Sequence, residues 1–382
     1  MKDNEPIRVL NMFTIMNRGG AETMVMNYYR NIDRSKVQFD FLVHRKERGE
    51  YDDEIESMGG RIYRMPPIYP QNFLKYKQMI KRFFREHPEY LIIHSHMSEL
   101  GYFAFREAKR QGIPIRICHA HNAPHGWDIK MLVRVYFKTR MMPYLTHLFT
   151  CGMEAGKWLY GERNQNRFIQ LNNAIDASKF RLNPKLARDK REELNISKKY
   201  VIGHVGRFEE QKNHMFLLHV FREVVLQKPD AVLVLVGNGS LKPRVEKKAE
   251  ELGITKNIMF LGSRDDVHEI MQTFDVFVFP SLYEGFPVTL VEAQAAGNLC
   301  IISAEQPKEA ILTENVRRVS LRRCAKNWAD YIVAMGERYE KYDTYEILQS
   351  RGYDIVENAA KLQEFYLEQV DLELHHRRTL RR

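Results

Sequence analysis

The chain has 382 residues, which is long enough for two domains with separate hydrophobic cores. Hydrophobic residues make up 44% of the sequence and charged residues 28%, which are ordinary values for a globular protein. No run of about 18 apolar residues occurs, so the sequence excludes a membrane-spanning helix. The 59 Lys and Arg residues exceed the 49 Asp and Glu residues, and the net charge of +10 could serve a nucleic acid, an anionic membrane surface or anionic substrates.

Two further features favour a cytoplasmic location. The first residues, MKDNEPIRVL, lack the apolar segment of a secretory signal. The four cysteines are widely scattered, without the spacing of a metal site or of a disulfide framework. We therefore expect buried thiols in a reducing compartment.

Strand and helix patterns alternate through the first half of the chain, which predicts a doubly wound α/β sheet. A first strand spans 7–13, and the pair Gly19 and Gly20 forms a flexible turn before a helix that begins near Ala21. A helix over 73–87 carries aromatic residues on one side and several Lys and Arg residues elsewhere. Such a helix can lie on an anionic bilayer or can pack its apolar face on the sheet, and the two interpretations are compatible.

Two pairs of histidines follow two predicted strands of this half. His94 and His96 end the run YLIIHSH, and His119 and His121 end the run IPIRICHAH. Residues two apart on a strand point to the same side, so each pair resembles part of a metal site. No carboxylate follows at ligand spacing and no H-E-x-x-H occurs, which argues against a zinc hydrolase. Structural histidines, a polar wall of a binding site and a metal site all remain open interpretations.

The α/β pattern restarts after a polar helix, and we place the domain boundary near residue 183. Gly206, Arg207 and Lys212 follow the first strand of the second half. Cations at a strand end can neutralise a diphosphate leaving group, or they can simply face solvent. The strand AVLVLV leads into a glycine loop at 237–239, which lacks the third glycine of a dinucleotide fingerprint.

The stretch 275–302 carries the most functional information. DVFVFP is typical of a buried strand, SLYEGF of a turn with Gly285, and VTLVEAQAAG of a helix that ends at Gly297. Glu284 lies in the loop and Glu292 in the helix, and between them are the free N–H groups of a helix N-terminus, which form an anion site. Carboxylates can hold sugar hydroxyls while the amides hold a pyrophosphate, although two glutamates eight apart also occur on solvated helices.

The segment EGFPVTLVE, from Glu284 to Glu292, closely resembles the E-x7-E signature of retaining glycosyltransferases with the GT-B fold, family 4 in particular. The segment GRFEEQKN resembles the G-R-x4-K element of this family, and RGGAE at 18–22 resembles its GGAE loop. Further matches lie at 236–239 and 260–267. The order and spacing of these segments are more specific than any one of them, and the likeness is greatest to bacterial enzymes of capsular or exopolysaccharide assembly.

The resemblance implies two Rossmann-like doubly wound domains that face each other across a cleft. It assigns residues 1–182 to an acceptor-binding domain and residues 183–352 to a nucleotide-sugar-binding domain. Residues 353–382 would form a closing helix that crosses back to the first domain, followed by a basic tail. Such a tail is a further candidate contact with an anionic membrane.

The reaction that the resemblance implies is retaining transfer from a nucleoside-diphosphate sugar, a UDP-sugar by preference, without an obligatory metal or other cofactor. Arg207 and Lys212 would take the charge of the leaving diphosphate, while Glu284 would hold the donor sugar. The other donor-binding residues are expected to be Gly19, Gly20, Gly206, Gly237, Gly239, Arg264, Gly285, Phe286, Pro287, Val288, Thr289, Leu290 and Glu292. Arg264 would face the nucleotide base, unless it belongs to a helix-capping loop with Asp265 as the cap.

The acceptor side would contain His94, His96, His119 and Asn122. His121 would touch the donor sugar and help to orient the acceptor, and His119 is the alternative for that position because the motif is offset by one residue. The expected acceptor is lipid-linked or another saccharide. The expected place of the reaction is the inner face of the cytoplasmic membrane, with the protein bound peripherally.

Two other function classes remain. A protein with the GT-B fold can be a glycan phosphorylase or a nucleotide-sugar epimerase, which an assay with free phosphate as acceptor would separate. A nucleic-acid-binding module would use the net charge of +10 and would bind with a steep salt dependence. No nucleic-acid-binding motif occurs in the sequence, so we expect no nucleic-acid partner.

Overall fold

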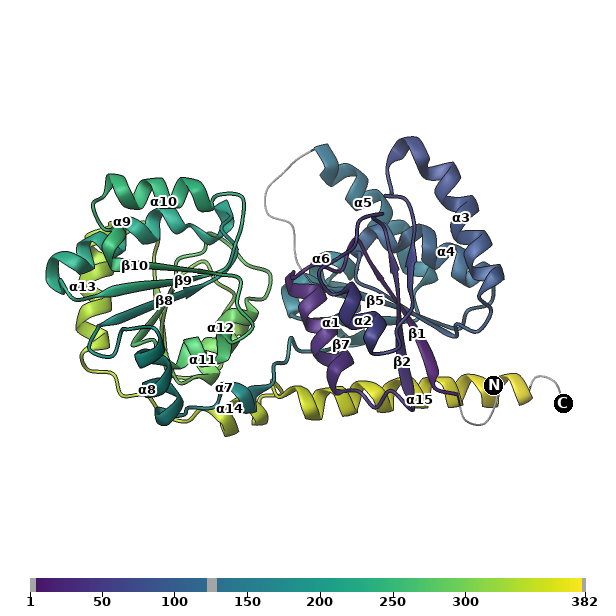
Figure 1. Ribbon diagram of the computed structural model, residues 1–382. Coiled ribbons are helices and arrows are strands. Elements are labelled where there is room, and N and C mark those ends of the chain that lie inside the picture. The colour runs from purple at the N-terminus through teal and green to yellow at the C-terminus, as the bar shows by residue number, and fades with distance from the viewer. Residues whose placement is uncertain (1–4, 122–128, 380–382) are drawn as a thin grey trace. The chain divides into compact units, whose positions relative to one another are not determined.

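The chain forms two compact units in the computed structural model, which describes residues 5–121 and 129–379. Unit 1 comprises Met1–Ala174 and Ile355–Arg382, and unit 2 comprises Ile175–Asp354. Each unit contains one parallel sheet with helices packed around it (Figure 1). Among the helices of the described residues, none combines the length and the apolar character that crossing a bilayer requires.

Unit 1 contains a seven-stranded parallel sheet in the order β3-β2-β1-β4-β5-β6-β7. Its strands are β1 (Ile7–Phe13), β2 (Val37–Val43), β3 (Ile62–Arg64), β4 (Ile92–Ser95), β5 (Ile115–Ala120), β6 (His147–Thr150) and β7 (Phe168–Gln170). The chain passes from β1 outward to β3 and then returns to β4 on the other side of β1, so the strand order reverses between β1 and β4. Ligands of such sheets bind at the carboxyl ends of the strands where the order reverses.

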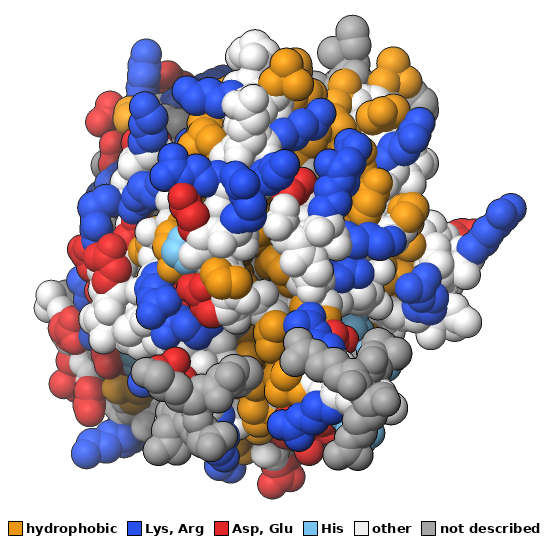
Figure 2. Space-filling view, turned by 90° about the vertical axis from the view of Figure 1, so that its right-hand side faces the viewer, with side chains coloured by type: hydrophobic (Ala, Val, Ile, Leu, Met, Phe, Trp, Pro, Cys, Tyr) orange, Lys and Arg blue, Asp and Glu red, His pale blue; other side chains and the backbone are white. Residues whose placement is uncertain are grey.

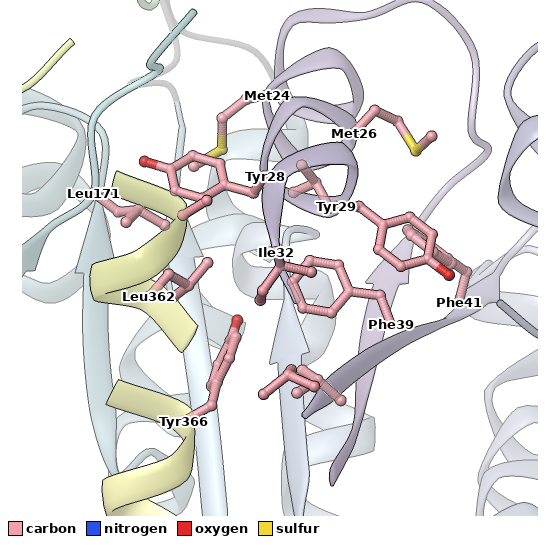
Figure 3. Close-up of a cluster of buried hydrophobic side chains, with 14 of the residues drawn as sticks. Met24, Met26, Tyr28, Tyr29, Ile32, Phe39, Phe41, Leu171, Leu362 and Tyr366 are labelled. Carbon is pink, nitrogen blue, oxygen red and sulfur yellow. The ribbon is translucent and has the colours of Figure 1, made fainter. Parts of the chain in front are cut away.

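The main helices of unit 1 are α1 (Gly20–Asn31), α2 (Asp52–Ser57), α3 (Phe73–Glu86), α4 (Tyr102–Arg110), α5 (Ile129–Met141), α6 (Met153–Tyr160) and α15 (Ile355–Thr379). Figure 3 shows how α1 packs into the core. Met24 and Tyr28 of α1 are one turn apart and are buried, and Ile32 follows directly after the helix. These side chains belong to one apolar cluster with Phe39 of β2, on whose ring Tyr29 of α1 stacks.

Helix α15 is the last element of the chain, yet it belongs to the core of unit 1. Leu362 and Tyr366 are four residues apart and are 4% and 0% exposed, and both join the cluster around α1 (Figure 3). Burying a large apolar side chain contributes about 1.5–3 kcal/mol. Several such side chains therefore hold this helix on unit 1.

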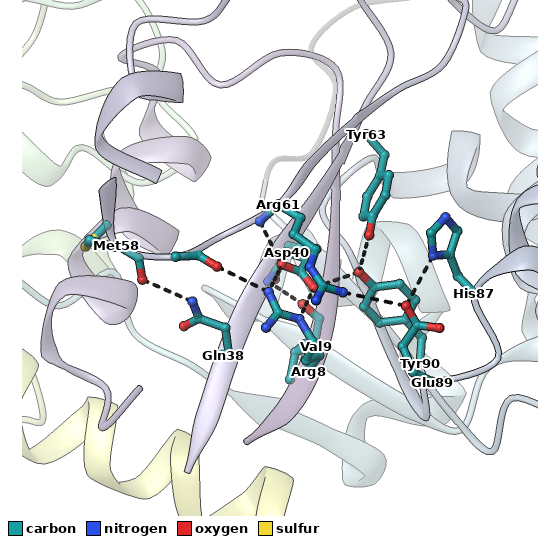
Figure 4. Close-up of polar contacts among 12 residues, drawn as sticks. Arg8, Val9, Gln38, Asp40, Met58, Arg61, Tyr63, His87, Glu89 and Tyr90 are labelled. Atoms are coloured by element: carbon teal, nitrogen blue, oxygen red, sulfur yellow. Dashed lines mark hydrogen bonds and ion pairs between the residues drawn. The ribbon is translucent and has the colours of Figure 1, made fainter. Parts of the chain in front are cut away.

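A buried ion pair joins β1 to β2. Arg8 donates from Nε and Nη2 to the two carboxylate oxygens of Asp40, at 2.6 and 2.5 Å, and the Tyr90 hydroxyl donates to Asp40 at 2.6 Å (Figure 4). The backbone N–H of Arg61 completes the shell of the carboxylate. A buried carboxylate is stable only when it is paired and hydrogen-bonded, which this shell achieves.

Unit 2 contains a six-stranded parallel sheet in the order β10-β9-β8-β11-β12-β13. Its strands are β8 (Val201–Val205), β9 (Val232–Val236), β10 (Ile258–Gly262), β11 (Val276–Phe279), β12 (Leu299–Ser303) and β13 (Val316–Val319). Its helices are α7 (Ala177–Phe180), α8 (Pro184–Glu193), α9 (His214–Gln227), α10 (Lys242–Glu251), α11 (Val267–Gln272), α12 (Val288–Ala295), α13 (Ala325–Gly336) and α14 (Tyr345–Ser350). The strand order reverses between β8 and β11, so the ligand-binding position of this sheet lies after these two strands.

The first residues of unit 2 lie before the boundary that the sequence predicts near residue 183. The segment 175–182 packs with unit 2 through α7, which contacts α11, α12 and α14, and through hydrogen bonds to Gln272 of α11. The Gln272 side chain donates to the carbonyl of Phe180 at 2.8 Å and accepts from the backbone N–H of Asn183 at 3.1 Å. Nothing in the local sequence indicates this contact, since the glutamine lies about ninety residues further along the chain.

Candidate functional site

The predicted site residues of unit 2 gather at the carboxyl ends of β8 and β11. Lys212 lies in the short 3₁₀ helix η5 (Glu210–Lys212) after β8, and its Nζ forms an ion pair with Glu284 Oε1 at 2.7 Å. The Gln211 side chain donates to the other carboxylate oxygen of Glu284 at 3.0 Å. The ammonium group also lies 4.7 Å from the ring centre of Phe279, the last residue of β11. Burial, the carboxylate and the ring therefore fix the position of the Lys212 cation.

Arg207 is exposed, and it precedes η5 by three residues in the sequence. Its guanidinium forms no hydrogen bond or ion pair with any residue that the structure describes. We call Arg207, Lys212, Glu284 and Glu292 the charged site. An unpaired guanidinium at a strand end remains available for an anionic ligand.

Glycines allow three loops at the ends of β8, β9 and β10 to pack backbone against backbone. Gly237 has a φ of +133°, and a Cβ atom there would lie 2.2 Å from the carbonyl oxygen of Gly206. A Cβ atom at Gly239 would lie 2.6 Å from the backbone of Phe208. Hydrogen bonds from Phe208 N–H to Asn238 O, at 2.9 Å, and from Gly237 N–H to Gly262 O, at 2.8 Å, join the loops. A side chain at either glycine would push these loops apart.

The loop and helix start after β11 contain the predicted Gly285, Phe286, Pro287, Val288, Thr289 and Leu290. Pro287 precedes α12, and its carbonyl accepts from the N–H of Leu290 at 3.0 Å. Val288 and Thr289 occupy the first two positions of the helix, where the N–H groups have no acceptor within the helix. The buried ring of Phe286 stacks on Tyr353 at 5.7 Å between ring centres and so holds the loop in place. This helix start has the form of an anion site.

Glu292 lies in the second turn of α12 and is half-buried. Within the described part of the chain its carboxylate has neither a hydrogen-bond donor nor a cation as partner. Burial raises the pKa of Glu292 to about 7. A partly buried carboxylate without a protein partner and with a raised pKa is typical of a functional group.

Arg264 is paired within the protein. Its guanidinium donates to both carboxylate oxygens of Asp266, at 2.7 and 2.6 Å, and Lys190 of α8 reaches the same carboxylate at 2.9 Å. The side-chain hydrogen bond of Arg264 lowers the pKa of Asp266. Asp266, rather than Asp265, occupies the N-cap position of α11, so the prediction that Asp265 is the cap was wrong by one residue.

In unit 1, the glycine pair lies at the carboxyl end of β1. Gly19 is the N-cap of α1 and Gly20 is its first residue. A Cβ atom at Gly19 would lie 2.3 Å from a carboxylate oxygen of Glu22, which folds back over the turn. Gly20 has no atom within 4 Å of such a position. A side chain at position 19 would therefore displace the Glu22 carboxylate, whereas position 20 is open.

The four predicted histidines of unit 1 meet at the carboxyl ends of β4 and β5, and we call them the histidine cluster (His94, His96, His119 and His121). They are 0–9% exposed. Rings stack in pairs, with centres 4.4 Å apart for His94 and His96 and 4.3 Å apart for His119 and His121. Burial lowers the pKa of all four, to about 3 for His94 and to about 4 for His121. The cluster is therefore neutral at physiological pH. Asn122 lies outside the described residues.

His94, His96 and His119 each offer one ring nitrogen, and these nitrogens lie within 4.8 Å of one another. A metal ion lies in the plane of each imidazole that binds it, and a tetrahedral site needs planes that converge on one point. The planes of His94 and His96 differ by only 24°, and those of His94 and His119 by 18°. The ring planes of these stacked pairs run side by side and do not converge on one point.

The structure adds two residues to the histidine cluster that sequence reasoning missed. The Tyr366 hydroxyl of α15 lies 2.7 Å from His94 Nδ1, and Asn11 Oδ1 of β1 lies 3.4 Å from His96 Nε2. Asn11 carries a signal, because it is a polar residue within the apolar strand IRVLNMF. Tyr366 carries none, because it resembles any other aromatic residue on an amphipathic helix.

The fold and the site define the class of protein. Two Rossmann-like units with polar side chains at their strand-order reversals form the GT-B architecture. HepE from Anabaena, solved in complex with UDP, superposes on the chain with a TM-score of 0.77 at 16% identity, covering 94% of this chain and all of HepE. Residues 187–347 match the model of the family "Glycosyl transferases group 1", and residues 18–152 match "Glycosyltransferase Family 4".

Proteins of similar sequence identify the family to which the chain belongs. The putative glycosyltransferase EpsF of Bacillus subtilis is 38% identical over 94% of this chain and 96% of its own length. CapH of Staphylococcus aureus, a capsular polysaccharide biosynthesis glycosyltransferase, is 26% identical over 94% of this chain and 99% of its own length. An Escherichia coli enzyme, named as a UDP-Gal:alpha-D-GlcNAc-diphosphoundecaprenol alpha-1,3-galactosyltransferase, is 28% identical over 70% of this chain and 72% of its own length. The chain belongs to the group 1 glycosyltransferases and is an enzyme.

Proposed function

We propose that this glycosyltransferase moves a sugar from a UDP-sugar to a lipid-linked or other saccharide acceptor, with retention of anomeric configuration, in capsular or exopolysaccharide assembly. The names of CapH and of the Escherichia coli galactosyltransferase support the pathway, the donor class and the lipid-linked acceptor. The UDP complex of HepE supports the nucleotide. Within this chain, the charged site supports a nucleotide-sugar as the donor.

Glu292 is the single observation that carries the proposal. Its half-buried carboxylate has no described partner, and its pKa is raised to about 7. Ribose hydroxyls would supply the missing donors and would favour the ionised form. Glu292 shares one loop and one helix with Glu284 and with the amides of Val288 and Thr289. This short segment therefore offers carboxylates for hydroxyls and N–H groups for phosphates.

The reaction would break the bond between the anomeric carbon and the diphosphate and would form a bond from that carbon to an acceptor hydroxyl oxygen. The acceptor proton would pass to the leaving diphosphate, so no nucleophile of the enzyme is needed. Arg207 and Lys212 would stabilise the negative charge that develops on the leaving group. Lys212 is paired with Glu284 before the donor binds. The diphosphate would replace Glu284 as partner of Lys212, and Glu284 would then accept hydrogen bonds from the donor sugar.

The test is a thermal-shift panel of UDP-, GDP- and ADP-sugars, because a ligand that binds the native state raises its stability. We expect UDP-sugars to give the largest shift. Glu292→Gln should reduce that shift and should lower turnover with the stabilising donor by roughly a hundredfold, while the circular dichroism spectrum is unchanged. Equal shifts from all three nucleotides, or normal turnover in Glu292→Gln, would contradict the donor assignment.

The surface of unit 1 supports peripheral binding to an anionic membrane. Helix α3 buries its apolar face within the unit, at Tyr76, Ile80, Phe83 and Phe84, and leaves its basic side chains exposed. Figure 2 shows a face on which Lys and Arg side chains gather with hydrophobic side chains between them. The four cations Lys77, Lys81, Arg106 and Arg110 line a hollow of about 170 Å³ between α3 and α4.

Helix α5 adds exposed apolar side chains to this basic surface. Leu132, Val133, Val135 and Tyr136 are 67%, 48%, 41% and 53% exposed. Phe137 of the same helix packs on Phe73, the first residue of α3, with ring centres 5.8 Å apart, so the two helices are neighbours. Apolar side chains flanked by cations match the boundary between headgroups and acyl chains of an anionic bilayer.

Vesicle flotation tests this surface. We expect the protein to float with vesicles that contain phosphatidylglycerol and to stay unbound with pure phosphatidylcholine vesicles. Leu132→Asp should weaken the binding several-fold. Leu226→Asp is the matched control, because Leu226 is 68% exposed on α9 of unit 2. Equal loss in both variants, or no preference for anionic vesicles, would contradict the membrane proposal.

A further inference from the structure

The histidine cluster contains a chain of hydrogen bonds whose direction is set at one end. The carbonyl of Val9 can only accept, and it accepts from Asn11 Nδ2 at 3.4 Å. This contact fixes the orientation of the amide, so Asn11 Oδ1 faces His96 Nε2 at 3.4 Å. An amide oxygen also only accepts, so His96 carries its proton on Nε2.

The direction then passes to the next imidazole. A neutral imidazole has one N–H group, so His96 Nδ1 carries a lone pair. This nitrogen lies 2.9 Å from His121 Nε2, which must be the donor. His121 Nδ1 is consequently a lone pair as well. It is buried and has no hydrogen-bond partner in the described part of the chain.

The rings that form this chain are fixed in place by stacking. Phe13 lies on His96 with ring centres 4.4 Å apart and planes 8° apart, and His119 lies on His121 at 4.3 Å. The backbone of His121 is held as well, because Cys151 Sγ lies 3.1 Å from its carbonyl oxygen. Burial lowers the pKa of both His96 and His121, so neither ring gains a second proton near neutral pH.

We propose that Asn11 and His96 are positioning residues that hold His121 in the tautomer with its proton on Nε2, so that His121 Nδ1 accepts a hydrogen bond from a sugar hydroxyl. The chain of contacts from Val9 to His121 leaves one buried acceptor without a donor, and a sugar hydroxyl can supply that donor. The role of the hydroxyl as part of the substrate rests on the proposed function. The tautomer of His121 does not depend on it.

Nuclear magnetic resonance of the full chain with ¹⁵N-labelled histidines tests the tautomer directly. We expect a scalar coupling across the hydrogen bond between His121 Nε2 and His96 Nδ1, with the proton attached to His121. Asn11→Leu removes the acceptor of the proton on His96 Nε2. The other proton, which lies between His121 and His96, should then no longer be confined to His121 Nε2. A proton on His96 Nδ1 in the wild type, or no coupling, would overturn the proposal. So would a stoichiometric metal in elemental analysis, because it would occupy the same lone pairs.

Kinetics separates positioning from a merely structural role. The rate of UDP release is measured with the UDP-sugar that stabilises the protein most in the thermal-shift panel. His96→Phe keeps an aromatic ring on Phe13 but removes the acceptor, and the rate should fall roughly a hundredfold, as expected for a misplaced reacting group. His96→Asn restores an acceptor oxygen near the position of Nδ1 and should recover much of the rate.

His219→Asn, on the exposed side of α9, is the control and should leave the rate unchanged. Equal rates in His96→Phe and His96→Asn would overturn the positioning role. If UDP-sugars neither bind nor turn over, the proposed function fails, while the coupling experiment still decides the tautomer.

Discussion

The two units place their functional side chains at the same position of two similar sheets, yet the chemistry differs. In unit 2, the strand-order reversal between β8 and β11 carries the charged site, with Lys212 and Glu284 paired at 2.7 Å. In unit 1, the reversal between β1 and β4 carries the histidine cluster, whose rings are buried and neutral. The same topology therefore supports one charged site and one neutral site.

This difference separates two tasks of a glycosyl transfer. A leaving diphosphate develops negative charge, which positioned cations and helix N–H groups stabilise. Hydroxyl groups carry no charge, so a neutral acceptor with a fixed lone pair is sufficient to orient one. We therefore propose that unit 2 stabilises the charge of the leaving diphosphate, and that the neutral acceptors of unit 1 orient a sugar hydroxyl in addition to the hydroxyls that Glu284 and Glu292 would bind.

The largest expected effect follows from removing the central cation of the charged site. Lys212→Ala should lower kcat/KM by about 10²–10³, because one charge partner of the leaving diphosphate is lost. Lys228→Ala is the matched control, since Lys228 forms a 2.5 Å ion pair with Glu337 elsewhere in unit 2. Steady-state kinetics of both variants, with the donor from the thermal-shift panel, checks this. Similar rates in both would break the assignment of charge stabilisation to this site.

The glycine loops of unit 2 should be intolerant of a side chain. Gly237→Ala combines a φ of +133° with a Cβ atom 2.2 Å from Gly206 O, and we expect a loss of about 3 kcal/mol in the free energy of unfolding. Gly253→Ala, with a φ of +68° and no atom within 4 Å of its Cβ position, should lose about 1 kcal/mol. Urea denaturation measures both. Equal losses would show that the backbone approach of these loops is unimportant.

Glu292 should make the stability of the protein depend on pH. Its pKa is raised from the ordinary 4.5 to about 7, so the folded state binds the proton more tightly than the unfolded state. This contribution is fully present below about pH 4.5 and is lost as the pH rises to about 7. Glu292→Gln should therefore be more stable than the wild type by roughly 2 kcal/mol at pH 8 and nearly equal to it at pH 5. A difference that does not change between the two pH values would contradict the unpartnered carboxylate.

The smallest expected effect concerns the neutral site. Tyr366→Phe removes the hydroxyl that lies 2.7 Å from His94 Nδ1 and should lower the free energy of unfolding by about 1 kcal/mol. Tyr136→Phe is the control, because Tyr136 is 53% exposed and its loss should change little. Urea denaturation of both variants checks this. A larger loss in Tyr136→Phe would show that the hydroxyl of Tyr366 does not support the cluster.

Much of the fold could be predicted from the sequence because its signals are local. Alternating apolar strands and amphipathic helices indicated two α/β domains, and the successive segments DVFVFP, SLYEGF and VTLVEAQAAG indicated the strand–loop–helix that the structure contains. The two histidine pairs could be placed at strand ends for the same reason. The side on which each residue of a strand points follows from alternation alone.

The remaining features depend on contacts between distant parts of the chain. The pairing of Lys212 with Glu284 joins residues 72 apart, and the contact of Tyr366 with His94 joins residues 272 apart. The first residues of unit 2 are held by residues far along the chain, with Ile175 on Tyr353 and Phe180 on Gln272. The ion pair of Arg264 with Asp266 is local, yet the sequence alone does not tell whether the arginine serves its neighbour or a ligand.

Hydrogen–deuterium exchange with and without UDP tests the division of tasks most directly. We expect slower exchange in unit 2, at 206–213 and 284–291, when UDP is added to the wild type. Lys212→Ala should lose most of this protection, and the strand ends that carry the histidine cluster should change less than the charged site does. Protection confined to β4 and β5, or none in unit 2, would contradict the assignment of the nucleotide diphosphate to the charged site.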